Sequence, residues 1–324
     1  MTPADLSRTV LHAVHRAVQD GVLSAPVPER VSVERPRPGG RGDYATNVAL
    51  RLAGPAGQPP RAVAETLRAR IVDDSRIASV EITGPGFLNI TLRAGAQQAL
   101  VRRVLEQGIR YGHRDGQDDQ RDPRPLLDVP RVQGEGDLRI RLWAQSVQRL
   151  RAAQGFGQEF VAETGSLDAS GPDVPYDDET RWAMLSVAAH DHPRPPAHFL
   201  PQREDNPLFQ VRYAHSRARA LTRNAAALGF VGVPDEQVDT PLAQLVEDHP
   251  AVLASAARLG APDRLARHLE ATADALLDFQ HCVLPLGDEK PMAAHRSRLA
   301  LAEAAGTVLA GGLSLLGISA PVHL

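Results

Sequence analysis

The chain has 324 residues, of which 43% are hydrophobic and 23% are charged, so it can bury the cores of two or three domains. Its single cysteine, Cys282, excludes an internal disulfide. No Cys/His pair has zinc-finger spacing, so we expect no metal and no cofactor. The net charge of -3 means that a nucleic-acid partner would need a local basic surface.

The N-terminus is predicted to form an amphipathic helix. Leu6, Val10, Val14 and Val18 fall on one helical stripe. The segment lacks the continuous apolar core of a signal peptide, and no stretch of the sequence reads as long enough to span a membrane. We therefore expect a cytoplasmic location and no membrane partner.

The first third of the chain mixes both kinds of secondary structure, which predicts an α/β domain. Glycine and proline flank a turn at residues 84–86, where two short apolar runs meet. The expected helices cover residues 1–20, 45–54, 59–74 and 94–107, and the expected strands cover 79–83 and 87–92.

The middle of the chain is short and the remainder is helical. Residues 111–125 are polar and charged, as in a linker, and short strands are predicted at 126–129 and 159–164 around a helix at 138–154. After a loop at 166–178, helical periodicity continues to the end. Helices are expected within residues 177–190, 206–229, 237–284 and 292–316.

Two groups of motifs carry a family resemblance. GDYATNVALRLAG and GPGFLNITL resemble the N-terminal domain of arginyl-tRNA synthetases, which contacts the tRNA D-loop. NPLFQVRYAHSRARAL, DRLARHLEATADALLDF and LSLLGISAP resemble the DALR-type anticodon-binding domain of the same family. The resemblance implies a multidomain α+β fold in three parts. These are a mixed α/β domain at 1–112, a short βα remnant of a class I synthetase core at 113–178, and an all-α bundle at 179–324.

The catalytic signature of that family is degenerate in this chain. Gly134, Glu135, Gly136 and Asp137 stand where a His-x-Gly-His motif would hold the ATP phosphates at a helix N-terminus. Two carboxylates replace the imidazoles, and they repel an anion at the same place. The only lysine, Lys290, lies in the helical part. We expect Glu135 in a solvated loop and Asp137 as a helix N-cap.

A candidate RNA surface lies on the strand at 87–92. By strand alternation Leu88, Ile90 and Leu92 point one way, and Phe87, Asn89 and Thr91 point the other. An aromatic ring beside an amide can stack on an unpaired base and read its edge, although an ordinary half-buried strand has the same pattern. The resemblance favours RNA contact by Phe87 and Asn89. For Tyr44 and Asn47, RNA contact and a structural role stay open.

A second candidate surface lies on the helix that follows Asn206. Val211, Ala214, Ala218 and Leu221 form its predicted buried stripe. Arg212, Arg219 and Arg223 recur on another side, with Tyr213 and Arg217 beside them. Such a stripe can bind phosphates and bases, or it can be a solvated face. His215 reads as a core histidine. The final Val322-His323-Leu324 departs from the family's usual Glu-Arg-Met ending.

The resemblance and the degenerate signature together predict a non-catalytic paralogue that binds tRNA, with arginine tRNA as a candidate, and that does not bind DNA. An alternative is a protein-interaction or regulatory module that reuses the same fold for a protein partner. A second alternative is residual arginine-tRNA ligase activity, against which the missing histidines and lysine argue.

Overall fold

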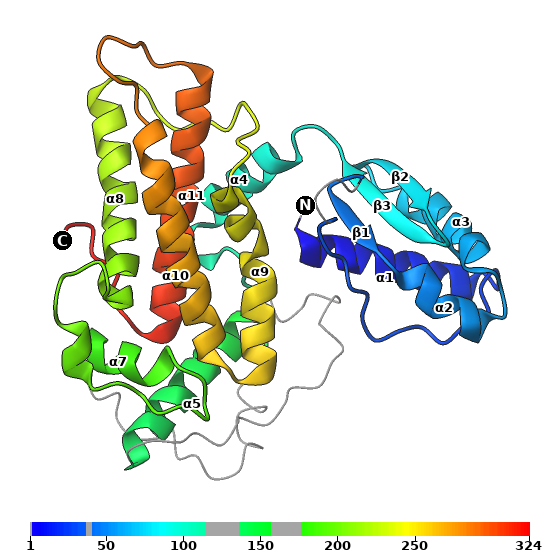
Figure 1. The fold of residues 1–324 in the computed structure, drawn as a ribbon, viewed down its shortest axis with the longest axis horizontal. Coiled ribbons are helices and arrows are strands. Elements are labelled where there is room, and N and C mark those ends of the chain that lie inside the picture. The colour runs from blue at the N-terminus through cyan, green and yellow to red at the C-terminus, as the bar shows by residue number, and fades with distance from the viewer. Residues whose placement is uncertain (1, 37–40, 115–135, 157–175) are drawn as a thin grey trace. The chain divides into compact units, whose positions relative to one another are not determined.

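The computed structural model describes residues 2–36, 41–114, 136–156 and 176–324. It divides into two compact units, Met1–Leu100 and Val101–Leu324 (Figure 1). The first unit is mixed α/β and the second is helical, as the sequence predicts. The described part of the middle segment belongs to the helical unit and does not form a body of its own.

The described residues of the first unit form three helices and a three-stranded antiparallel sheet with strand order β1-β3-β2. The predicted strand pair forms as the hairpin β2–β3, whereas β1 was not predicted because it is only three residues long. The elements are α1 (Pro3–Gln19), β1 (Tyr44–Thr46), α2 (Val48–Ala56), α3 (Pro60–Ile71), β2 (Ile77–Thr83) and β3 (Phe87–Leu92); α4 (Ala96–Gln107) leads into the second unit.

The core of the first unit lies between the helices and one face of the sheet. Thr2 and Asp5 form a capping box that starts α1, and the stripe predicted from Leu6 and Val10 is buried. α2 and α3 pack on β3 and β2. Leu88 and Ile90 are fully buried under them, which confirms the core-facing side of β3.

Two motif glycines are required by close backbone approaches. Gly42 has φ +75°, and a Cβ there would lie 2.9 Å from the carbonyl oxygen of Ile90. Gly86 has φ +151°, and its Cβ would lie 2.9 Å from the carbonyl oxygen of Pro60. Both positions exclude side chains, so these glycines allow the backbone to approach Ile90 and Pro60 closely.

The second unit is a helical bundle around α11, which packs against α8, α9 and α10 (Figure 1). The predicted helix at 237–284 divides in two at Gly260, which adopts the left-handed conformation before Pro262. The predicted strands at 126–129 and 159–164 lie outside the described residues. The elements are η1 (Gly108–Arg110), α5 (Gly136–Ala153), α7 (Asp178–Leu185), η2 (Pro196–Phe199), α8 (Pro207–Ala227), α9 (Pro241–Leu259), α10 (Pro262–Phe279), η3 (Gln280–Cys282) and α11 (Ala293–Leu316).

α11 differs from the expectation that no stretch could span a membrane. Within the described ranges it is the one helix that is long and apolar enough to do so, and 78% of its most apolar window is buried in the bundle. Its apolar character comes from its central position. Small residues let neighbours approach closely: a Cβ on Gly306 would lie 2.7 Å from Cβ of Ala218, and one on Gly311 would lie 2.7 Å from the carbonyl oxygen of Ile109.

α5 places polar side chains against the C-terminal ends of other helices. Trp143 Nε1 donates to the carbonyl of Gly260 at 2.8 Å, and Arg151 Nε donates to that of Ala257 at 3.3 Å, both at the end of α9. Arg149 Nε donates to the carbonyl of Leu315 at 2.9 Å, at the end of α11. These bonds reach carbonyls at helix ends, where a helix cannot pair its own last acceptors, although that of Ala257 also accepts from the N–H of Gly260 at 3.3 Å.

Arg139 of α5 serves the end of α7 in the same way. Its side chain is fully buried and donates to four backbone carbonyls. Burial lowers the pKa of its guanidinium, opposed by the charges of Asp191 and Asp263. Its carbon Cζ also lies 5.3 Å from the ring centroid of Trp143. The acceptors are Met184 (3.1 Å), Asp191 (2.7 Å), Ala188 (3.0 Å) and Val187 (3.4 Å).

Candidate nucleic-acid interfaces

The first candidate surface is centred on Phe87, whose side chain is 41% exposed. Phe87 pairs with Thr83 on β2. Thr46 of β1 pairs with Leu88, so the next position places Asn47 opposite Phe87. Asn47 is exposed, and so is Arg51 one helical turn further along α2. Phe87, Asn47 and Arg51 form what we call the hairpin surface.

Arg51 was not predicted as a site residue, because relating it to Phe87 requires the pairing of β1 with β3. The available signal was its spacing of four residues from Asn47, which puts both on one face of a helix. The backbone N–H of Arg51 donates to the carbonyl of Asn47 at 3.3 Å, so the turn that aligns them is formed.

Two other predicted site residues lie inside the first unit and support the hairpin surface from within. Tyr44 is only 3% exposed, because its pairing with Ile90 puts both residues on the core face. Its hydroxyl accepts a hydrogen bond from Arg35 at 3.3 Å. Asn89 is buried, and its Nδ2 donates to Thr83 Oγ1 at 2.7 Å across the hairpin. The expected pattern of exposed Phe87 and Asn89 is therefore corrected: only Phe87 reaches solvent.

The second candidate surface lies on α8. Asn206 caps this helix, with Oδ1 accepting from the N–H groups of Leu208 and Phe209 at 3.1 and 3.3 Å. His215 is buried with Nδ1 3.0 Å from the carbonyl oxygen of Gly306, and burial lowers its pKa, as expected of a core histidine. The predicted buried stripe is confirmed: it consists of Val211, Ala214, Ala218 and Leu221.

The polar side of α8 carries two adjacent stripes. Phe209, Tyr213 and Arg217 recur at a spacing of four and form the aromatic stripe. The rings of Phe209 and Tyr213 are stacked, with centroids 5.5 Å apart and planes at 17°. Arg217 Nε donates to Gln280 Oε1 at 2.7 Å, which fixes the guanidinium beside Tyr213. Phe209 was missed, although its spacing from Tyr213 was a usable signal.

Arg212, Ser216 and Arg223 form the second stripe, which we call the arginine stripe. Arg212 lies 3.7 Å from Asp178 and 3.6 Å from Glu179, both in the first turn of α7. Arg223 is exposed and lies 3.5 Å from Nδ1 of His323. The sequence showed no acid within this stretch of α8, but α7 supplies two carboxylates from outside it.

Arg219 lies at the edge of the arginine stripe and faces α11. It is exposed, and its charge lowers the pKa of Glu303, against the larger effect of burial, which raises that pKa. The solvent side of α10 is acidic. Burial and the charge of Asp274 raise the pKa of Glu270, and the charge of Asp278 adds to burial in raising that of Asp274. A basic helix face therefore has acidic neighbours.

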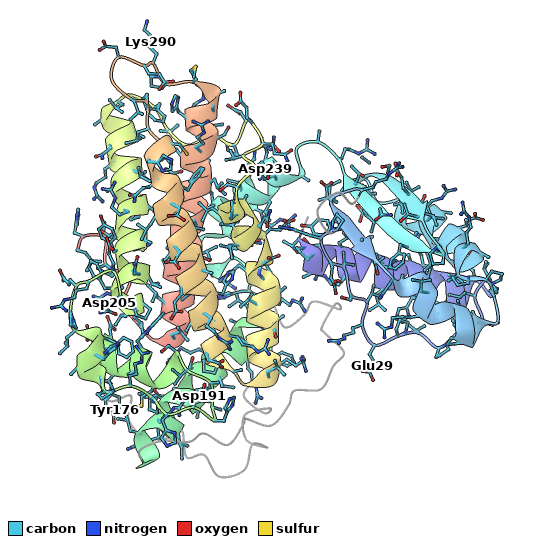
Figure 2. All side chains as sticks on the ribbon, viewed as in Figure 1. Glu29, Tyr176, Asp191, Asp205, Asp239 and Lys290 are labelled. Carbon is cyan, nitrogen blue, oxygen red and sulfur yellow. The ribbon has the colours of Figure 1, made fainter. Side chains whose placement is uncertain are left out.

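The degenerate catalytic signature is only partly described. Gly134 and Glu135 lie outside the described residues, and α5 begins at Gly136. Asp137 therefore lies in the first turn of the helix, and its predicted capping role stays a prediction. Lys290 lies in the loop between η3 and α11, at the end of the bundle opposite Tyr176 and Asp191 (Figure 2). Of the residues that the structure describes, none form a group of three or more His, Cys, Asp or Glu suited to a metal ion.

Two regions of the chain match models of known domain families, and the two candidate surfaces lie in these regions. Residues 5–92 match the model of the arginyl tRNA synthetase N terminal domain, and residues 211–324 match that of the DALR anticodon binding domain. An arginine–tRNA ligase of Frankia alni is 52% identical over 113 residues, which is 35% of this chain and 20% of the relative. One of Renibacterium salmoninarum is 49% identical over 115 residues, which is 35% and 21%. Each match thus spans about a fifth of the relative.

Solved structures agree at the level of the fold. Thermus thermophilus arginyl-tRNA synthetase has a TM-score of 0.65 at 14% identity, covering 100% of both chains. Plasmodium falciparum arginyl-tRNA synthetase has a TM-score of 0.53 at 8% identity, covering 99% of each. An α/β unit followed by a helical bundle, each with a matched domain, defines the class: this is an aminoacyl-tRNA synthetase-like architecture. Within that class the chain is an arginyl-tRNA synthetase-like protein, which carries the family's N-terminal domain and its DALR domain.

Proposed function

We propose that the chain is a non-catalytic arginyl-tRNA synthetase paralogue that binds tRNA through two linked surfaces, with arginine tRNA as the first candidate. The hairpin surface would contact the D-loop and α8 the anticodon loop. One observation carries the proposal: within each matched domain an aromatic side chain stays exposed on a surface that also carries an arginine, Phe87 with Arg51 on the hairpin surface and Tyr213 with Arg217 on the aromatic stripe. A tRNA partner implies a cytoplasmic location.

The hairpin surface has the chemistry that an unpaired base requires. An exposed ring offers a stacking face to any base, and the amide of Asn47 can donate to and accept from a base edge. Arg51 adds a positive charge for a phosphate. Tyr44 and Asn89 support this surface from inside by holding β1, β2 and β3 in register.

The aromatic stripe on α8 is preorganised. Stacking on Phe209 holds the ring of Tyr213, and Gln280 holds Arg217, so little side-chain freedom is lost when a base stacks there. Two weak sites in one chain reinforce each other, because binding at one raises the effective concentration at the other.

Binding is tested by a filter-binding titration with bulk tRNA at two salt concentrations. A variant with Arg212, Arg219 and Arg223 changed to Ala should bind more weakly and with a flatter salt dependence, by roughly 0.9 in log-log slope for each duplex phosphate that is no longer neutralised. Phe87→Ala should lose about 1–3 kcal/mol, the contribution of one stacked base, with its salt slope unchanged. Arg264→Ala, at an exposed position on α10, is the matched control. Wild-type affinity and slope in the triple variant would refute the assignment of α8, provided circular dichroism shows native helix content.

The proposed lack of arginine-tRNA ligase activity is tested by a separate assay. Adenylate formation requires positive groups at the ATP phosphates, whereas the signature position carries Glu135 and Asp137. We expect no arginine-dependent ATP-pyrophosphate exchange. Exchange that requires arginine, and that persists after any contaminating synthetase is removed, would establish the ligase alternative.

A protein-interaction role is the second candidate, and the acidic side of α10 favours it. Glu270, Asp274 and Asp278 recur at helical spacing on the solvent side, where they would repel RNA and attract a basic protein. If the wild-type chain shows no saturable tRNA binding at either salt concentration, this candidate replaces the tRNA proposal.

A further inference from the structure

The residues that follow α11 fold back along α8. Residues 318–323, which we call the strap, run beside the arginine stripe in the same direction as the helix (Figure 1). Ser319 lies at the level of Arg212, because both contact Asp178. Ser216 Oγ donates to the carbonyl oxygen of Val322 at 3.2 Å, and Arg223 Nη2 lies 3.5 Å from Nδ1 of His323.

The two ends of the strap are held by bonds of different strength. At its start, the backbone N–H of Ser319 donates to Asp178 Oδ1 at 3.2 Å, and the hydroxyl of Ser319 donates to Asp178 Oδ2. Both bonds end on a carboxylate, and charge-assisted hydrogen bonds are about twice as strong as neutral ones. Towards its end, the strap offers only a peptide carbonyl and an imidazole. The strap is therefore anchored at Asp178 and exchangeable at Ser216 and Arg223.

Asp178 connects the anchor to the arginine stripe. The same carboxylate that holds Ser319 lies 3.7 Å from Nη1 of Arg212, and Glu179 adds a second charge at 3.6 Å. Asp177 caps α7 through Thr180 at 2.7 Å, which places this acidic turn where the positive end of the helix dipole stabilises it. The first turn of α7 thus holds the strap and one stripe arginine at once.

We propose that the strap is an autoinhibitory latch on the arginine stripe, which an RNA phosphate opens by taking the donors Ser216 and Arg223 from the strap. This rests on the proposed function and adds regulation to that same surface. A phosphate oxygen carries a negative charge, so it outcompetes a carbonyl and an imidazole nitrogen, neither of which is an anion, for these donors. The anchor at Ser319 sets how readily the exchange occurs.

The test is the tRNA titration of the full chain with Ser319→Ala, at about 50 mM and about 200 mM salt. Loss of the hydroxyl bond weakens the anchor, so we expect tighter tRNA binding and a log-log salt slope steeper by about 0.9, for one additional neutralised phosphate. Over this fourfold change in salt, the affinity advantage over wild type should fall by about 3.5-fold. Ser314→Ala, an exposed serine on α11, is the matched control and should bind as wild type does.

A second variant separates a latch from a merely structural bond. If the gain comes from freeing Arg223, then Ser319→Ala combined with Arg223→Ala should bind no more tightly than Arg223→Ala alone. Weaker binding by Ser319→Ala, or binding equal to wild type in affinity and slope, overturns the latch while the tRNA proposal stands. If neither wild type nor Ser319→Ala binds tRNA, both proposals fail.

Hydrogen exchange of the backbone amides gives an independent readout. The amide of Ser319 donates to Asp178, so its exchange should be slow in the free protein and faster in Ser319→Ala. Saturating tRNA should accelerate exchange across the strap of the wild type. If tRNA instead slows exchange there, the strap is part of the binding surface and the latch is excluded.

Discussion

Replacing Arg139 by Met tests whether α5 stabilises the helical unit through its inward polar side chains. The change removes the donor of four backbone carbonyls while keeping most of the apolar volume. A buried acceptor left without a partner costs about 1–3 kcal/mol. The carbonyl of Ala188 still accepts from the N–H of Asp191 at 2.9 Å, so three acceptors at the lower limit give about 3 kcal/mol, and relief of the buried charge keeps the loss near that limit.

Urea unfolding followed by tryptophan fluorescence measures this loss in the helical unit alone. The only tryptophans are Trp143 and Trp182, and both are fully buried in that unit. With a slope of about 2 kcal/mol per molar urea, a loss of about 3 kcal/mol moves the midpoint by about 1.5 M. Because Arg139 lies over the ring of Trp143, the folded baseline will shift too, so midpoints rather than intensities are compared.

Two further variants of α5 complete the Arg139 prediction. Arg139→Lys keeps the charge but cannot reach all four carbonyls with one ammonium group, so an intermediate loss of about 2 kcal/mol is expected. Arg141→Met changes an exposed arginine on the same helix and should cost less than about 0.5 kcal/mol. A loss below about 1 kcal/mol for Arg139→Met would show that water replaces the guanidinium, and the capping role of α5 would be refuted.

The remaining predictions concern stability of the bundle. Burial lowers the pKa of His268 to about 4 from 6.5, so the folded state favours the uncharged imidazole. The folding stability linked to this shift is complete above pH 6.5 and is lost as the pH falls towards 4. Urea midpoints should show a loss of about 2 kcal/mol between about pH 7 and pH 5, and a smaller loss in His268→Gln. His249, which stacks on His268 at 5.3 Å, shifts in the same direction and steepens the effect. Gly306→Ala should lower stability by about 1–3 kcal/mol, because its Cβ would lie 2.7 Å from that of Ala218, and adding Ala218→Gly should restore the stability; no rescue would disprove the steric cause.

Local patterns predicted most helices and the β2–β3 hairpin, because periodicity and turn residues act within a few positions. The buried stripe of α8 followed from spacing alone. The same patterns could not show that Asn89 turns its amide to Thr83, since the distance between them depends on the hairpin register. Nor could they show that Asp178 of α7 lies beside Arg212 of α8.

The inward arginines of α5 were unpredictable for a different reason. Arginine is almost never fully buried unless it is paired, so a sequence rich in arginine reads as an exposed helix. At Arg139 the partners are backbone carbonyls, which have no signature in the sequence. Tyr44 shows the opposite case, in which a residue considered for RNA contact is buried because an unpredicted short strand pairs it with Ile90.

The capping role of α5 separates the domain recognised by sequence from the part able to fold. The DALR match begins at residue 211, yet the carbonyls that end α9 and α11 are satisfied by residues about 60 positions or more before that point. A fragment cut at the sequence boundary would expose those helix ends and lose Trp143 from its core. Exchanging this domain between relatives should therefore succeed only when α5 is exchanged with it, so the two segments are expected to be inherited as one unit.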